Sequence, residues 1–215
     1  MRGRNTLKRT AVFLDIDGTL CNYNGEVPPS AGDAVRAARK AGHVVVLCTG
    51  RFRAEIYPEL WEFGVDGLID GNGSYVELNE KVLLHQPIPE TEAHAIADWL
   101  HERGLEFFLE SNNGLFASEH FETAGEPVIR QYSAGKGVEN AAAMQVLVEH
   151  AGISAEHTVA LGDAKDDIPM FEFARVGVAM GNAGEEAQVA ADFVTDDVDE
   201  HGLAHAFTRL GLITK

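Results

Sequence analysis

The stretch from Ala11 to Leu20 constrains the fold more than any other part of this chain. It begins with four apolar residues, Ala11–Leu14, and continues directly into two acids that flank Ile16. A short run of large and β-branched apolar residues is typical of a strand buried on both faces, as in a parallel sheet covered by helices on both sides. Polar residues after such a strand lie at the carboxyl edge of the sheet, where open α/β sheets bind their ligands.

The residues that follow this strand are suited to an anionic ligand. Asp15 and Asp17 stand two residues apart, so an extended backbone places both carboxylates on one face. Gly18 permits a sharp turn, and the backbone N–H groups after Asp17, including that of Thr19, are candidate donors to an anion. The same residues also fit a surface turn in which the acids only solvate the end of the strand. Motifs elsewhere in the chain are needed to distinguish an anion site from a surface turn.

The composition of the chain excludes several classes of protein. A net charge of −17 over 215 residues argues against nucleic acid as a partner, because contacts with a phosphate backbone need clustered Lys and Arg. No stretch is long enough to span a membrane, so we expect no membrane partner. The two cysteines, Cys21 and Cys48, are too few for a disulfide framework, and we expect buried thiols in a cytoplasmic protein. An acidic chain repels anions, so a cation is expected at any anion site.

Further apolar runs predict more strands of the same sheet. Residues 43–48 form one such run, which ends at Thr49, Gly50 and Arg51, and residues 67–70 and 157–161 form two others. Helical patterns separate these runs, at about 31–41 and 138–151. We therefore predict an α/β protein whose core is a doubly wound, Rossmann-like parallel sheet.

The periodicity changes between residues 74 and 133. Two alternating runs, 74–78 and 81–85, predict a hairpin, and a helix at about 90–103 and strands at 105–110 and 114–117 follow it. We interpret residues 74–133 as a small inserted α+β module, which leaves 1–73 plus 134–215 as the core. The insertion is expected above the carboxyl edge of the sheet. Its candidate substrate contacts are Glu110, Asn112, Asn113 and His120.

Acids gather at the ends of the predicted strands, at Asp15, Asp17, Asp163 and Asp167. Four neighbouring carboxylates repel one another unless a divalent cation lies among them, and an oxygen-rich site with open positions suits Mg²⁺. We therefore expect Mg²⁺ as the cofactor and a small phosphorylated molecule as the substrate. In this interpretation Asp15 attacks phosphorus, Asp17 is the general acid and base, and Thr49 holds the transferring oxygens together with backbone N–H groups.

Three ordered motifs resemble those of the haloacid dehalogenase superfamily of phosphatases. They are Asp15-Ile-Asp-Gly-Thr-Leu20, Thr49-Gly-Arg51 and Gly162-Asp-Ala-Lys-Asp-Asp167, followed by Val178-Ala-Met-Gly-Asn-Ala183. The place of the insertion resembles the C2 cap of the sugar-phosphatase-like IIB branch. The resemblance implies that Asp15, Asp163 and the carbonyl of Asp17 ligate the metal and that Asp167 supports the metal shell. The substrate-binding candidates are Gly18, Thr19, Gly50, Arg51, Asn140 and Asn182.

The sequence departs from the family pattern before the last motif, where a lysine is expected to open the helix. Asn140 occupies that register, and Lys136 lies one helical turn earlier. Four residues along a helix displace a side chain by about 6 Å on one face, a gap that a long lysine side chain can cover. Lys136 is therefore our candidate catalytic cation, with a solvated loop charge as the alternative. Asp166 stands where relatives often carry Asn, which favours a metal and disfavours an anionic substrate.

Four functions are consistent with this pattern. We favour a Mg²⁺-dependent phosphomonoester hydrolase that forms an aspartyl-phosphate and acts on a sugar phosphate, nucleotide or cofactor. A phosphomutase shares the core and the nucleophile but transfers the phosphoryl group to a product. A phosphate-ligand binding protein of low activity would follow from the loss of the lysine at Asn140. A receiver domain also uses an Asp as phosphoacceptor, but Asp17 and the insertion argue against it.

Overall fold

The computed structural model describes residues 8–121 and 138–214 of the chain. One mixed sheet runs through the core in the order β10-β9-β8-β1-β2-β3-β4-β5, and the pairs from β10 to β3 are all parallel. The strands are β1 (Ala11–Leu14), β2 (Val44–Cys48), β3 (Gly67–Asp70), β4 (Tyr75–Leu78), β5 (Lys81–His85), β8 (Thr158–Gly162), β9 (Val176–Ala179) and β10 (Phe193–Val194). The predicted α/β fold with a central parallel sheet is confirmed.

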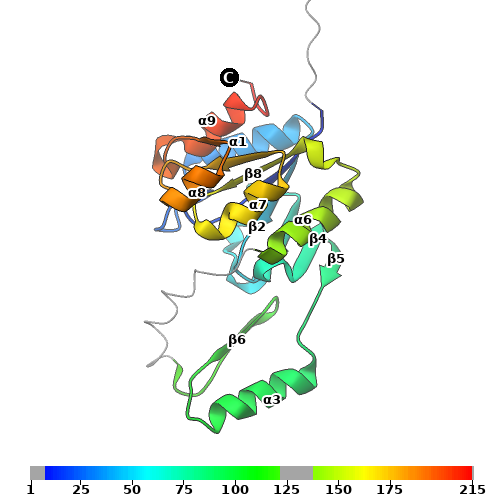
Figure 1. Cartoon of the computed structure of the whole chain (residues 1–215), viewed down its shortest axis with the longest axis vertical. Helices are drawn as coiled ribbons and strands as arrows, with labels where there is room; N and C mark the ends of the chain where they lie inside the picture. The colour runs from blue at the N-terminus through cyan, green and yellow to red at the C-terminus, as the bar shows by residue number, and fades with distance from the viewer. Residues whose placement is uncertain (1–7, 122–137, 215) are drawn as a thin grey trace, which may run out of the picture.

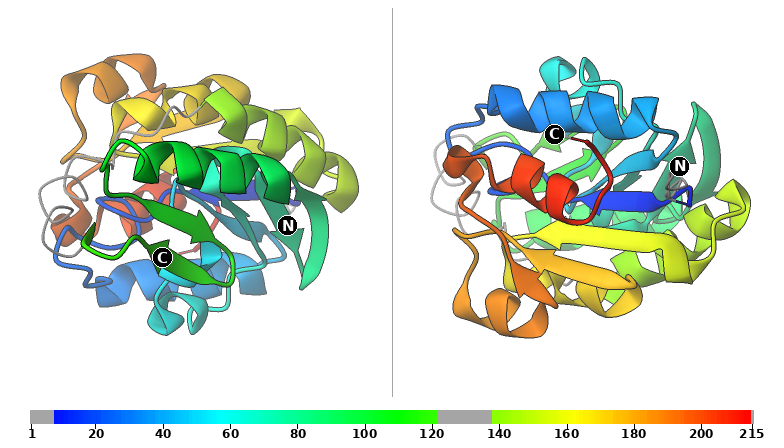
Figure 2. Two further views of the ribbon diagram at one scale, coloured as in Figure 1. Left: turned by 90° about the horizontal axis from the view of Figure 1, so that it is seen from below. Right: turned by 90° about the horizontal axis from the view of Figure 1, so that it is seen from above.

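Helices cover both faces of this sheet (Figures 1 and 2). One layer contains α1 (Pro29–Lys40), α2 (Pro58–Trp61) and α9 (Gly202–Arg209), and the other contains α6 (Val138–Ala151), α7 (Ile168–Phe173) and α8 (Glu185–Ala190). Short 3₁₀ turns are η1 (Arg53–Glu55), η2 (Gly71–Gly73), η3 (Ala155–His157), η4 (Lys165–Asp167) and η5 (Val198–Glu200). No helix in the described ranges is long and apolar enough to cross a membrane.

The central strand β1 supplies side chains to both layers, because successive residues of a strand point to opposite faces. Leu14 belongs to the core cluster that contains Phe207 of α9, whereas Phe13 belongs to the cluster that contains Met144 of α6. All four of these side chains are fully buried. The polar residues that follow β1 are thereby fixed at one edge of a rigid sheet.

The hairpin of β4 and β5 belongs to the main sheet, so the prediction that it opens the inserted module was wrong. β4 pairs antiparallel with β3, with Ile69 opposite Val76, and β5 continues the sheet beyond β4. Both Ile69 and Val76 are fully buried in one core cluster. Asn79 and Glu80 have φ angles of 50° and 64°, which gives the tight two-residue turn that twisted strands favour.

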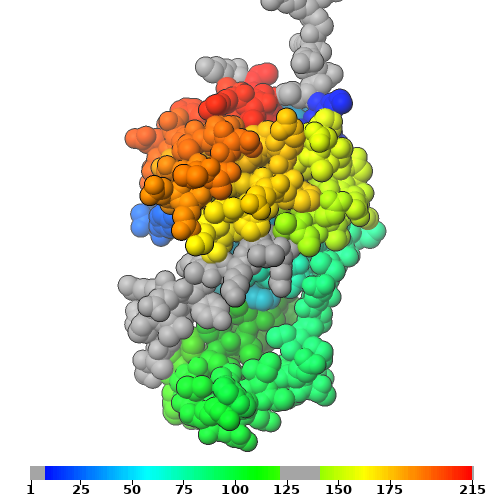
Figure 3. All heavy atoms as spheres, in the orientation of Figure 1, coloured from blue at the N-terminus to red at the C-terminus, as the bar shows by residue number. Residues whose placement is uncertain are grey.

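The described part of the insertion forms a lobe outside the main sheet. It consists of α3 (Glu90–His101), β6 (Phe108–Ser111) and β7 (Gly114–Ala117), and β6 and β7 pair antiparallel. An extended segment links β5 to α3, and the lobe projects from the core in the cartoon and in the space-filling view (Figures 1 and 3). We call this lobe the cap. The domain boundary expected near residue 133 lies outside the described residues.

Candidate active site

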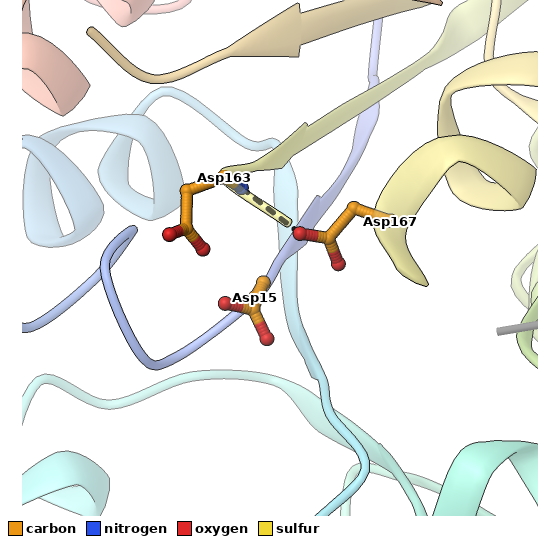
Figure 4. A group of neighbouring side chains, drawn as sticks. All are labelled: Asp15, Asp163 and Asp167. Atoms are coloured by element: carbon orange, nitrogen blue, oxygen red, sulfur yellow. Dashed lines mark hydrogen bonds between the residues drawn. The ribbon is translucent and has the colours of Figure 1, made fainter. Parts of the chain in front are cut away.

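Three carboxylates converge where β1 and β8 end (Figure 4). Asp15 follows β1, and Asp163 and Asp167 lie in the segment after β8, which pairs in parallel with β1. One oxygen of each carboxylate lies within 4.8 Å of the others. Asp163 and Asp167 are only 4% and 6% exposed. Neighbouring parallel strands end at the same edge of a sheet, which is why residues so far apart in the sequence meet here.

Burial and mutual repulsion make this cluster costly without a cation. Burial raises the pKa of Asp15 well above its ordinary value, and the charges of Asp167 and Asp163 raise it further. Burial also raises the pKa of Asp163 and raises the pKa of Asp167 to about 7. A divalent cation among the oxygens offsets the repulsion and stabilises the ionised form of the acids despite their burial. The donor set therefore fits such an ion.

The side chain of Asp167 bonds to the backbone at the start of the segment that follows β8. One of its carboxylate oxygens accepts hydrogen bonds from the backbone N–H groups of Asp163, at 2.9 Å, and Ala164, at 3.0 Å. A Cβ at Gly162 would overlap that same oxygen, so only glycine leaves room for it. Asp167 thus fixes the backbone that carries Asp163.

Asp17 lies outside this cluster, so the expectation that four carboxylates crowd together is corrected to three. The carboxylate of Asp17 accepts two hydrogen bonds from the guanidinium of Arg51, at 2.6 and 2.8 Å. Arg51 also donates to the carbonyl of Glu55, at 3.2 Å, and lies over the ring of Tyr57. The sequence assigned Arg51 to the substrate, whereas the structure pairs its guanidinium with the carboxylate of Asp17.

The family profile of the haloacid dehalogenase-like hydrolases matches residues 12–140 and 134–207 of the chain. The chain belongs to this family. The putative phosphatase YkrA of Bacillus subtilis is 27% identical over 94% of this chain and 98% of its own length. The phosphoglycolate phosphatase of Methanothermobacter thermautotrophicus is 26% identical over 93% of this chain and 97% of its own length.

A solved structure extends this likeness to the subclass. The subclass IIB sugar phosphatase BT4131 superposes with a TM-score of 0.76 and 28% identity, covering 95% of this chain and 100% of that chain. Together these matches identify a haloacid dehalogenase-like phosphatase of the C2-capped IIB type, as the sequence motifs predicted.

In this phosphatase the turn after β1 uses several of its own N–H groups. Gly18 N–H donates to the carbonyl of Cys21, at 2.7 Å, and Thr19 N–H to that of Ile16, at 3.4 Å. Thr19 is fully buried, and its hydroxyl has no partner among the described residues. The structure therefore does not place Gly18 or Thr19 as donors to a substrate. Cys21 and Cys48 are buried and form no disulfide bond.

Two other N–H groups of the site remain available. Within residues 8–121 and 138–214, no acceptor is bonded to the backbone N–H of Asp17 or of Gly50. Thr49, at the end of β2, is 4% exposed, and its hydroxyl accepts from the N–H of Arg51, at 3.2 Å. The sequence predicted Gly50 as a substrate-binding residue, but it did not single out the N–H of Asp17. The N–H groups that are bonded within a turn depend on the conformation of the turn, which the sequence pattern does not give.

Asn182 ties the turn after β1 to the loop after β10. Its side-chain amide donates to the carbonyl of Gly18, at 2.8 Å, and its oxygen accepts from Val198 N–H, at 2.9 Å. This places Asn182 as a brace of the turn, since both ends of its amide are bonded to the main chain.

Asn140, at the expected lysine position, lies in α6. Lys136, one helical turn earlier in the sequence, lies outside the described residues. Whether Lys136 replaces the motif lysine therefore stays a prediction.

Two of the four polar cap candidates lie at the core. The side-chain oxygen of Asn112 accepts from Arg53 N–H in η1, at 3.4 Å. Burial raises the pKa of Glu110, and the charge of Glu55 in η1 raises it further. Asn113 and His120 form backbone bonds inside the cap instead, to Ser111 and Glu106. The tip of the β6–β7 hairpin therefore docks on η1, in which the carbonyl of Glu55 accepts from Arg51.

Proposed function

We propose that this phosphatase is a Mg²⁺-dependent phosphomonoester hydrolase that works through an aspartyl-phosphate on Asp15. The observation that carries the proposal is the convergence of the carboxylates of Asp15, Asp163 and Asp167 within 4.8 Å, the last two of them buried. Asp15, Asp163 and the backbone carbonyl of Asp17 would hold the ion, with Asp167 supporting them. When bound, Mg²⁺ supplies positive charge that offsets the repulsion between the nucleophile and a phosphate.

The reaction proceeds in two displacements at phosphorus. A carboxylate oxygen of Asp15 attacks phosphorus, the bond from phosphorus to the leaving oxygen breaks, and Asp17 gives that oxygen a proton. Water then attacks the phosphorus of the aspartyl-phosphate and gives its proton to Asp17, and inorganic phosphate leaves as the bond to Asp15 breaks. Arg51 orients Asp17 for both proton transfers, since it holds both carboxylate oxygens.

Donors for the transferring oxygens come from the ends of β1 and β2. The N–H groups of Asp17 and Gly50 and the hydroxyl of Thr49 are the groups that we assign to this role. They are fixed by the sheet before the substrate arrives. Donors that are already oriented stabilise developing charge without the cost of reorganisation.

The substrate is a small phosphorylated molecule, and we propose a sugar phosphate, nucleotide or cofactor whose leaving group faces the cap. Asn112 is the cap residue that bonds to η1, and Glu110 lies close enough to η1 to be affected by the charge of Glu55. Two of the three relatives named above are a phosphoglycolate phosphatase and a sugar phosphatase, whose leaving groups differ in charge. The leaving group therefore has to be found by assay.

Hydrolysis of p-nitrophenyl phosphate tests the proposed reaction. Wild-type protein should release phosphate with Mg²⁺ and stop with EDTA, and Asp15→Asn should be inactive. Asp33→Asn is the matched control, because Asp33 is an exposed acid of α1 that pairs only with Arg36 among the described residues. The proposal fails if folded protein with Mg²⁺ releases no phosphate from p-nitrophenyl phosphate or from a panel of phosphorylated metabolites. Transfer of the phosphoryl group to a second sugar, without release, would identify a phosphomutase.

A further inference from the structure

The hydroxyl of Tyr23 donates a hydrogen bond to the carboxylate of Asp163, a residue 140 positions later in the chain. The residue Tyr23 is 70% exposed. Core packing therefore does not require an aromatic residue here. The one polar atom of Tyr23 nevertheless points at an oxygen of the acid cluster.

The loop after β1 is shaped so that these two groups can meet. Gly18 has a φ of 82°, and a Cβ at this position would overlap the Asp163 carboxylate and lie 2.8 Å from the Tyr23 hydroxyl. The side-chain oxygen of Asn22 accepts from the N–H groups of Asn24 and Glu26, each at 3.0 Å. These bonds stabilise the turn that carries Tyr23.

We propose that Tyr23 is a positioning residue for Asp163 as a metal ligand, and this inference rests on the proposed Mg²⁺ site. An ionised carboxylate has two oxygens with about four lone-pair sites, so a phenol bonded to one oxygen leaves the other for the ion. Groups that hydrogen-bond to metal ligands fix their orientation, and their removal typically costs about 10- to 100-fold in metal affinity. Tyr23 thereby prepares Asp163 before the ion arrives.

Titration of Mg²⁺ into metal-free protein by isothermal titration calorimetry tests this role without turnover. Tyr23→Phe removes the hydroxyl and keeps the exposed ring. We expect the Kd for Mg²⁺ to rise about tenfold in this variant. Tyr75→Phe is the matched control, because it removes a phenolic hydroxyl that donates to a carboxylate outside the acid cluster, that of Glu77, at 2.7 Å. Its Kd should equal that of the wild type.

Three other results of the titration would contradict the role of Tyr23 or the metal site itself. An unchanged or lower Kd in Tyr23→Phe, with wild-type protein that binds Mg²⁺, contradicts the role of Tyr23 and leaves the proposed function intact. A Tyr23→Phe protein that is unfolded by circular dichroism also overturns it, because the residue is then required for folding. If Mg²⁺ gives the same heats with wild-type protein as with Asp163→Asn, the proposed metal site does not bind the ion, and both proposals are contradicted.

Discussion

Arg51 donates to both carboxylate oxygens of Asp17, at 2.6 and 2.8 Å, and so joins the end of β2 to the turn after β1. A lysine keeps the charge but cannot form this two-pronged contact. We expect Arg51→Lys to lower kcat for p-nitrophenyl phosphate about tenfold, which corresponds to about 1.4 kcal/mol in the activation barrier. Steady-state kinetics measure this, with Arg36→Lys on the exposed face of α1 as control. An unchanged kcat in Arg51→Lys would contradict the orienting role.

Gly162 should be needed for metal binding although it carries no side chain. In Gly162→Ala the new methyl group displaces the Asp167 carboxylate, and overpacking of this kind typically costs about 1–3 kcal/mol of stability. We expect the rise in Tm that Mg²⁺ gives the wild type to be reduced or absent, as differential scanning fluorimetry would show. Gly184→Ala is the control, since a Cβ there meets nothing within 4 Å. Equal Mg²⁺ effects in both variants would disprove the requirement.

The buried carboxyl of Asp70 should make stability depend on pH. Asp70, at the end of β3, is 0% exposed; one of its oxygens accepts from Arg53 N–H, at 3.1 Å, and the other has no partner among the described residues. Burial raises its pKa from 3.8 to about 7. Between these values the unfolded chain loses this proton and the folded chain keeps it, so rising pH favours unfolding.

Asp70→Asn removes this titration and is expected to gain stability relative to the wild type as the pH rises from about 4 to about 7. The gain should total on the order of 4 kcal/mol and stay constant at higher pH. Urea unfolding at several pH values gives the difference in the free energy of unfolding. A difference that does not vary across this range would show that Asp70 is ionised in the folded protein.

Glu110 is expected to select against anionic leaving groups. It stands near Glu55 at the contact between cap and core, and no cation among the described residues pairs with either side chain. Glu110→Gln should therefore raise kcat/KM for phosphoglycolate about fivefold relative to a sugar phosphate, whose leaving group is neutral, because one close repulsion is worth about 1 kcal/mol in water. Glu92→Gln, an exposed change on α3, should leave the ratio unchanged. A ratio unaffected by Glu110→Gln would place the leaving group elsewhere.

The sequence predicts the features that continuous local patterns encode. β1 and β2 are apolar throughout and buried throughout, and the convergence of Asp15 with Asp163 follows from two parallel strands that end at one edge. The alternation in residues 74–85 predicts a hairpin, but a hairpin alternates in the same way whichever strand it joins. Only the pairing of Ile69 with Val76 decides that it extends the main sheet.

The contacts that orient the site are not encoded in this local way. The sequence assigned Arg51 to the substrate, whereas the structure pairs it with Asp17. In the sequence, nothing distinguishes Tyr23 from an ordinary loop residue. Its hydrogen bond to Asp163 depends on the backbone conformation of the turn and on one side-chain conformation. Such contacts join residues far apart in the sequence, so no periodicity predicts them.

The central claim is that the phosphoryl group passes through Asp15, and trapping of the intermediate tests it most directly. Borohydride reduces an acyl phosphate to an alcohol, so enzyme quenched during turnover is treated with borohydride and analysed by peptide mass spectrometry. We expect homoserine at position 15 when both substrate and Mg²⁺ are present, and unmodified Asp15 when either is omitted. Release of phosphate at the normal rate with Asp15 never modified, or with another acid modified in its place, would contradict the account.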